Sequence, residues 1–193
     1  TLSLYSDIAT VFSEIGTAHI GGVDFDFIPH FEDEELIVKA VKNSKTHLFG
    51  HFGYDGCIAN EHYKYGSYLN PSHFNQDYFH FLGHIHKPQQ IKNTTILGTQ
   101  YSTSYGEANA QKFIHELLIR DGKVTVIRKP IEFGIRHIVS KIDELPAMNQ
   151  KYKFKDFFTI LRLKLDYLDS ATEQALKDDV LEKYSINHLE FAF

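Results

Sequence analysis

Two histidines separated by one residue, His84 and His86, are the side chains best placed to do chemistry. They follow a run of bulky apolar residues, in a segment that reads Phe-Leu-Gly-His-Ile-His-Lys-Pro. Side chains at positions i and i+2 of an extended segment point to the same side. Both imidazoles can therefore face one point beyond the end of a strand. Neutral imidazole is a good ligand for manganese, iron or zinc.

An upstream segment repeats this layout, because a short apolar run from His47 leads through Gly50 to His51. Open α/β sheets place their site residues at the C-terminal edge of parallel strands, so three imidazoles from two strand ends could converge there. A chance pattern is the competing interpretation, since the chain has twelve histidines. We predict a metal site with His51, His84 and His86 as ligands.

The elements that must position these residues follow from apolar periodicity and turn signals. We expect strands at 23–28, 46–49, 77–82 and 95–97, and a helix that begins in the acidic run 32–35 and ends near residue 42, with Leu36, Ile37 and Ala40 inward. We also expect an amphipathic helix capped by Ser3 and ending at Gly16, a helical turn at 71–74, and a hairpin of 112–120 with 123–128 around Asp121-Gly122.

The pattern of apolar and polar residues changes after Pro130. A strand at 135–142 and a polar connector at 144–155 precede a strand at 157–165, a capped helix at 170–184 and a strand at 188–193. Strand, helix and strand form a small βαβ unit. Basic and aromatic residues alternate from Lys151 to Lys155, which suits either phosphate contacts or a solvated connector.

Composition limits the classes of protein that this chain can belong to. Its 193 residues are 42% hydrophobic, which indicates a globular chain with a sizeable core. A single cysteine, Cys57, excludes an internal disulfide and a cysteine-based zinc cluster. No apolar run is long enough to cross a bilayer and no leader is apparent, so we expect a soluble, cytoplasmic protein that makes no membrane contact. Because the net charge of the chain is −5, we expect any contact with nucleic acid to use a local basic patch or bound metal ions.

Gly83-His84-x-His86, the earlier Gly50-His51 and the later run from Gly98 to Glu107 together resemble the later motifs of calcineurin-like metallophosphoesterases. Within that superfamily they are most similar to SbcD-type nuclease subunits of bacteria and phages. The similarity covers roughly residues 20 to 135 well and the rest loosely.

This resemblance implies an α/β (α+β) fold in two parts. Residues 1–134 would form the later half of a metallophosphoesterase β-sandwich flanked by helices, and residues 135–193 a small βαβ capping domain that contacts DNA. It implies a metal-dependent DNA nuclease subunit of an SbcCD-type complex that processes double-strand breaks. The cofactor would be two divalent metal ions, with manganese the usual metal. The partners would be DNA, an SbcC-type ATPase and, in the complete protein, a second copy.

The loop from Gly98 to Glu107 carries hydroxyl and aromatic side chains that suit contact with a phosphate backbone. Its candidate substrate-binding residues are Tyr101, Ser102, Ser104 and Tyr105. A tight structural turn is the alternative interpretation of this loop. The longer loop from Phe52 to Leu69 is equally open, because its tyrosines at 54, 63, 65 and 68 could line a substrate groove or only cover the loop.

The family's remaining metal ligands and its leaving-group acid are not found in residues 1–50. Two interpretations follow. The chain is the later part of a longer nuclease, or it is a non-catalytic relative that binds DNA or an ATPase. A small-molecule phosphodiesterase is a third possibility, because the superfamily shares these motifs. In each case we expect the 193-residue chain alone to be inactive, since two-metal hydrolysis needs a carboxylate bridge.

Overall fold

The computed structural model describes residues 7–59 and 63–193. By internal contacts the chain divides into two compact units, the first made of Thr1–Thr99 and Phe113–Lys129 and the second of Gln100–Lys112 and Pro130–Phe193. Over the described residues the fold is a mixed, sheet-rich α/β fold with three α-helices. No helix in these parts of the chain is long and apolar enough to span a bilayer.

A six-stranded sheet forms the centre of the first unit, in the order β1-β2-β3-β4-β6-β5. β2, β3, β4 and β6 run parallel, and the antiparallel strands β1 and β5 form the edges. The strands are β1 (Gly16–Ile20), β2 (Val23–Ile28), β3 (His47–Gly50), β4 (His80–Leu82), β5 (Gln89–Ile91) and β6 (Thr94–Ile96). The strands predicted at 23–28, 46–49 and 95–97 are therefore confirmed within a residue or two.

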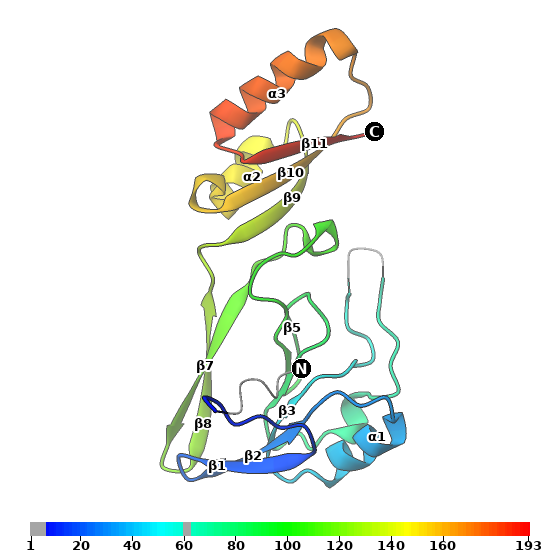
Figure 1. Cartoon of the computed structure of the whole chain (residues 1–193), viewed down its shortest axis with the longest axis vertical. Coiled ribbons are helices and arrows are strands. Elements are labelled where there is room, and N and C mark those ends of the chain that lie inside the picture. The colour runs from blue at the N-terminus through cyan, green and yellow to red at the C-terminus, as the bar shows by residue number, and fades with distance from the viewer. Residues whose placement is uncertain (1–6, 60–62) are drawn as a thin grey trace. The chain divides into compact units, whose positions relative to one another are not determined.

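Helix α1 (Glu34–Asn43) covers one face of this sheet (Figure 1). Asp33 caps it by accepting a hydrogen bond from the Leu36 amide at 3.0 Å. Ile37 and Val41, one turn apart, are buried against Leu48 of β3. Leu36 is 37% exposed, so its predicted inward position is wrong, because the apolar stripe follows the i, i+4 spacing from Ile37.

The opposite face of the sheet carries a ladder of aromatic rings. Phe27 of β2 stacks on Phe49 of β3 with a centroid distance of 5.2 Å, and Phe49 stacks on Phe81 of β4 at 4.9 Å. Phe12 stacks on Phe27 at 4.3 Å from outside the sheet. These residues are neighbours because alternate side chains of adjacent parallel strands share a face.

The predicted N-terminal helix is wrong over residues 7–15, which are irregular, while Ser3 and Leu4 lie outside the described residues. Two tertiary interactions account for this. The stacking of Phe12 on Phe27 uses a side chain that a helix would have turned into its own apolar stripe. Gly16, expected to end the helix, instead begins β1 and pairs with Phe27.

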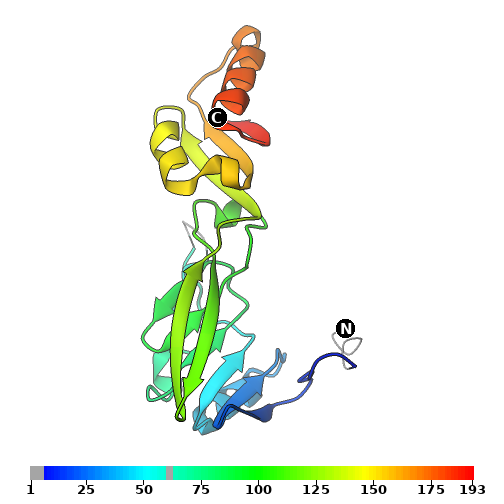
Figure 2. The same cartoon turned by 90° about the vertical axis from the view of Figure 1, so that its left-hand side faces the viewer.

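The predicted hairpin is confirmed as β7 (Phe113–Arg120) and β8 (Lys123–Pro130), which Figure 2 shows side by side. Asp121 and Gly122 both have positive φ, 50° and 71°, as a two-residue type I′ turn requires. Ile119 reaches the turn between β1 and β2, where its side chain would lie 3.3 Å from a Cβ placed on Gly21.

A three-stranded parallel sheet, in the order β11-β10-β9, forms the second unit. Its strands are β9 (Ile135–Lys141), β10 (Phe158–Lys164) and β11 (His188–Ala192). The helices α2 (Leu145–Tyr152) and α3 (Ser170–Tyr184) pack with Ile138, Leu161 and Leu189 into one apolar core. The predicted βαβ unit, β10-α3-β11, is confirmed.

Two further expectations need correction. The connector predicted at 144–155 contains α2, because Pro146 is tolerated in the first turn of a helix and Leu145 and Tyr152, seven residues apart, both face the core. The strand predicted at 77–82 begins only at His80, since residues 76–78 form turns and a bend. The expected helical turn after Asn70 is present as the short 3-10 helix η2 (Pro71–His73).

Candidate functional site

The register of the parallel strands brings three strand ends to one edge of the sheet. Ile28 of β2 pairs with Gly50 of β3, which pairs with Leu82 of β4. The pairing continues one step beyond the strands, because the His51 amide donates to the Ile28 carbonyl at 3.3 Å and the Gly83 amide to the Gly50 carbonyl at 2.9 Å. The C-terminal ends of β2, β3 and β4 therefore lie side by side at one edge of the sheet.

A histidine follows each of these strand ends by one or two residues. The rings of His51 and His84 lie edge to face with centroids 5.8 Å apart. His30, which follows β2, has its ring centroid 6.3 Å from that of His51. His30 is not among the ligands predicted from sequence. The sequence feature that points to His30 is Pro29, which marks the end of β2. Gly50 and Gly83 mark the ends of β3 and β4 in the same way.

His86 is near enough to His51 and His84 to affect the pKa of both imidazoles. Both residues are exposed at the surface, yet partial desolvation of their rings is the main cause that lowers the pKa values of His51 and His84. Nearby imidazoles add to this: His84, His30 and His86 lower the pKa of His51, and His30 and His86 lower that of His84. Both rings are held neutral near pH 7, the state in which imidazole offers a lone pair.

Two glycines allow the close packing beneath these rings. A Cβ on Gly83 would lie 2.7 Å from Nδ1 of His51, so only glycine leaves room for that ring. Gly98 has φ +71°, and a Cβ there would lie 2.6 Å from Cγ of Pro88 and 2.8 Å from the His86 carbonyl oxygen. The Thr99 amide donates to that carbonyl at 3.2 Å. Because Gly98 has no side chain, the backbone at this position can pack closely against the loop that carries His86.

His84 adopts a left-handed backbone conformation with φ 77°. This is uncommon for a residue with a side chain, and such outliers cluster at functional sites. Buried Ile85 anchors the loop, and its amide donates to the Gly83 carbonyl at 3.1 Å. The hydroxyl of Tyr65 lies 3.1 Å from Nε2 of His84.

The four tyrosines of the loop from Phe52 to Leu69 divide between the two roles considered for them. Tyr54 is fully buried and Tyr68 packs against the core, so both cover the loop. Tyr63 is 55% exposed. Tyr65 contacts the histidine group, which consists of His30, His51 and His84 with His86 nearby, through His84. Nothing in the sequence distinguished Tyr65 from the other three tyrosines of the loop.

The residues predicted to bind substrate lie in the second unit. Tyr101 is 53% exposed and Ser104 is exposed, whereas Ser102 is only 3% exposed. The Ser102 hydroxyl lies 3.1 Å from Nδ1 of His137. Tyr105 is half-buried: its ring lies 3.7 Å from the Arg162 guanidinium and 4.9 Å from the His137 ring. Ser102 and Tyr105 therefore make contacts within the second unit, whereas Tyr101 and Ser104 are accessible, and substrate binding by the four residues stays a prediction.

The carboxylates nearest in sequence to the histidines are engaged elsewhere. Asp24 pairs with His19 at 2.7 Å, and Asp26 accepts hydrogen bonds from Thr17 and Ser44, both at 2.6 Å. The Asp55 carboxylate lies 3.4 Å from the Ser67 amide, within its own loop.

The donor types suit a transition metal, but the set is incomplete. Within residues 7–59 and 63–193, no three His, Cys, Asp or Glu side chains are arranged to hold a metal ion. A two-metal centre also needs a bridging carboxylate, and the described carboxylates of Asp24, Asp26 and Asp55 have partners elsewhere. The described residues therefore do not form the two-metal centre that the resemblance implies.

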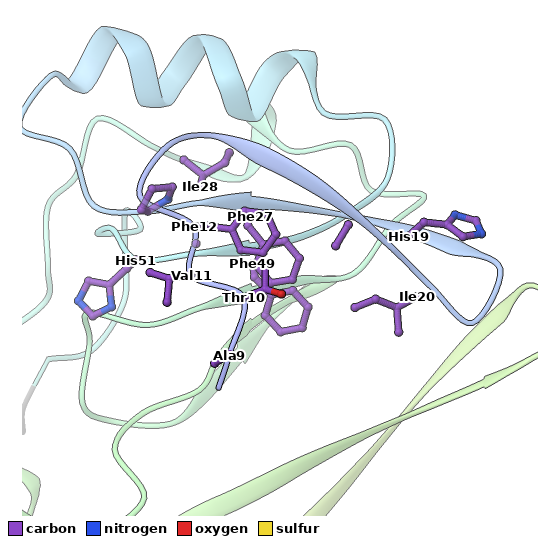
Figure 3. A pocket seen from close by; sticks show the side chains of 13 residues that line it. Ala9, Thr10, Val11, Phe12, His19, Ile20, Phe27, Ile28, Phe49 and His51 are labelled. Carbon is purple, nitrogen blue, oxygen red and sulfur yellow. The ribbon is translucent and has the colours of Figure 1, made fainter. Parts of the chain in front are cut away.

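An apolar cavity of about 830 Å³ opens on the aromatic face of the sheet. Phe12, Phe27 and Phe49 form its wall, and His51 stands at one end (Figure 3). The exposed part of the aromatic ladder is thus continuous with the histidine group.

No protein-family model matches this chain, and no curated protein sequence matches it.

Proposed function

We propose that this chain is the later part of a metal-dependent phosphodiesterase, a nuclease subunit of the SbcD type that acts on DNA. The observation that carries the proposal is the group of imidazoles at the ends of three adjacent parallel strands. His51 and His84 stand with ring centroids 5.8 Å apart, and their motifs are those that resemble the family. Imidazole ligands and divalent metals are the components of two-metal phosphoester hydrolysis.

The complete protein would take two divalent metal ions, with manganese as the expected metal, and polypeptide preceding Thr1 would supply the carboxylates. Two observations support this division. Asp24 and Asp26 are hydrogen-bonded away from the histidines. The cavity beside His51 leaves Phe27 and Phe49 partly uncovered, and an apolar sheet face of this kind is normally packed against another layer.

A non-catalytic relative that keeps the fold to bind DNA or an SbcC-type ATPase is the second candidate. It is favoured by the incomplete ligand set, because the described residues hold no group of three metal-binding side chains. The two candidates differ in whether the imidazoles bind metal at all.

Titration calorimetry with Mn²⁺ tests the proposal on the 193-residue chain. We expect weak binding that falls at least about tenfold in His51→Ala and in His84→Ala, because each removes a direct ligand. His188→Ala, which changes an exposed histidine of the second unit, is the control and should bind as the wild type does. Equal affinity in all four proteins would favour the non-catalytic candidate.

A further inference from the structure

Tyr65 contacts the histidine group from outside the strand ends and their turns. Its hydroxyl lies 3.1 Å from Nε2 of His84, and the two rings meet at 73° with centroids 5.6 Å apart. Among the described residues this hydroxyl makes no other hydrogen bond. The contact joins the loop that follows β3 to the turn that follows β4.

The loop that carries Tyr65 is built to hold it in place. The Tyr65 amide donates to the Cys57 carbonyl at 2.6 Å, and its carbonyl accepts from the Gly56 amide at 2.9 Å. Ile58 and Lys64 add an antiparallel bridge next to these bonds. This pairing fixes the backbone of Tyr65 on both sides.

The ring of Tyr65 is held as firmly as its backbone. A Cβ on Gly53 would lie 2.2 Å from Cε1 of Tyr65, so glycine is the residue that lets the ring pass. The half-buried ring packs against the apolar core of the first unit. The Tyr65 hydroxyl therefore approaches His84 from a rigid support.

A hydrogen bond to one nitrogen of an imidazole determines which nitrogen remains available, and it also fixes the orientation of the ring. We propose that Tyr65 is a positioning residue for His84: its hydroxyl oxygen accepts the Nε2 proton, which leaves Nδ1 unprotonated as the nitrogen that His84 presents at the site. The functional meaning of this arrangement rests on the proposed metal-dependent activity. The arrangement itself exists in the chain without metal.

The backbone of His84 supports the same conclusion. Its left-handed conformation, φ 77°, turns the side chain in a direction that an ordinary strand end would not give. An exposed imidazole in such a turn has several rotamers open to it. The bond to Tyr65 selects one of them.

The test is the tautomer of His84, read from the nitrogen chemical shifts of ¹⁵N-histidine-labelled protein at a pH where the imidazole is neutral. We expect the wild-type chain to show His84 mainly protonated on Nε2. Tyr65→Phe keeps the ring and removes only the hydroxyl, so the His84 shifts should move toward a mixture of both tautomers. The melting temperature should change little.

Tyr63→Phe is the matched control, because Tyr63 neighbours Tyr65 in the same loop at a ring distance of 6.5 Å. It should leave the His84 tautomer as in the wild type. A wild-type His84 protonated on Nδ1, or a tautomer unchanged by Tyr65→Phe, would overturn the proposal. If Tyr65→Phe fails to fold, a wild-type His84 protonated on Nδ1 would still overturn the proposal. Because the measurement needs no metal, it can fail while Mn²⁺ binding succeeds, and the reverse.

Discussion

The rings of His51 and His84 meet edge to face with their centroids 5.8 Å apart, each just beyond the end of one of two neighbouring parallel strands. Their meeting is set by strand register, since Gly50 and Leu82 are paired residues of β3 and β4. The pairing of β3 with β4 therefore sets the relative positions of the two rings. Substitutions that shift one ring should alter the other.

Gly83→Ala is the sharpest such substitution. Its new methyl group would lie 2.7 Å from Nδ1 of His51, closer than side-chain carbons approach. We expect the His51 ring to be displaced, with clear shifts of the imidazole resonances of both His51 and His84. Unfolding should become easier by only about 1 kcal/mol, because a side chain can move aside more readily than backbone.

Gly66→Ala is the control for that variant, since nothing lies within 4 Å of a Cβ at this position. Its histidine resonances should match those of the wild type. If Gly83→Ala gives the same spectrum as Gly66→Ala, the packing of His51 against Gly83 is not as described.

The sequence was sufficient to predict the strands that carry the histidines, because short apolar runs ending in Gly-His are strong local signals. It was not sufficient to identify Tyr65 or to include His30 among the site residues. Tyr65 reaches His84 through pairing within its own loop. His30 joins the group because β2 lies beside β3, and the proline that ends β2 does not indicate which strand is its neighbour. The carboxylates of Asp24 and Asp26 have hydrogen-bond partners other than the histidines of the site.

The failed expectations share a physical cause, which is tertiary context overriding local pattern. Residues 8–15 have helical spacing, yet Phe12 is used to stack on Phe27 and Gly16 pairs into β1. The segment around Pro146 appeared polar, yet Leu145 and Tyr152 face a core formed by strands on both sides of it in the sequence. Periodicity alone does not reveal which partner will cover a given side chain.

His80 should make the stability of the chain depend on pH. Its side chain is 2% exposed and lies 3.2 Å from the Thr94 hydroxyl, and burial lowers its pKa to about 4 from the usual value of 6.5. Above pH 6.5 the group is neutral in both folded and unfolded chains and has no effect. As the pH falls from 6.5 to 4 only the unfolded chain gains the proton, so stability decreases by about 3 kcal/mol.

Urea unfolding at a series of pH values measures this effect. A His80→Gln variant should lose a substantial part of the decrease between pH 6.5 and 4, because glutamine does not titrate. Parallel curves for wild type and variant would contradict the assignment to His80.

Tyr101 and Tyr105 should behave differently when each is changed to alanine. Tyr105 packs on Arg162 and His137, so Tyr105→Ala should cost about 2 kcal/mol of stability. Tyr101 is 53% exposed, so Tyr101→Ala should change stability by no more than about 0.5 kcal/mol. If the loop contacts DNA in the complete enzyme, Tyr101→Ala should weaken DNA binding at unchanged stability. Equal thermal losses in the two variants would contradict the packing described here.

A buried ion pair in the second unit joins Lys112 and Glu107, whose side chains are 5% and 3% exposed. Glu107→Ala removes a buried carboxylate that faces the Lys112 ammonium, and should cost about 3 kcal/mol. The comparison is Glu116→Ala, which removes the exposed pair of Glu116 with Lys129 and should cost less than about 1 kcal/mol. Thermal denaturation of the two variants should rank them in this order, and the reverse order would show that the buried pair does not stabilise the unit.

We propose that the histidine group is the imidazole part of a metal-dependent phosphodiesterase site. Assays of Mn²⁺-dependent hydrolysis of linear duplex and single-stranded DNA test this proposal. The assay compares the 193-residue chain with a version extended N-terminally through its native gene, each with and without His84→Ala. We predict activity in the extended version only, abolished by His84→Ala. Activity of the short chain that His84→Ala abolishes would show that these residues build a complete site, and an extended version whose activity survives His84→Ala would contradict the claim.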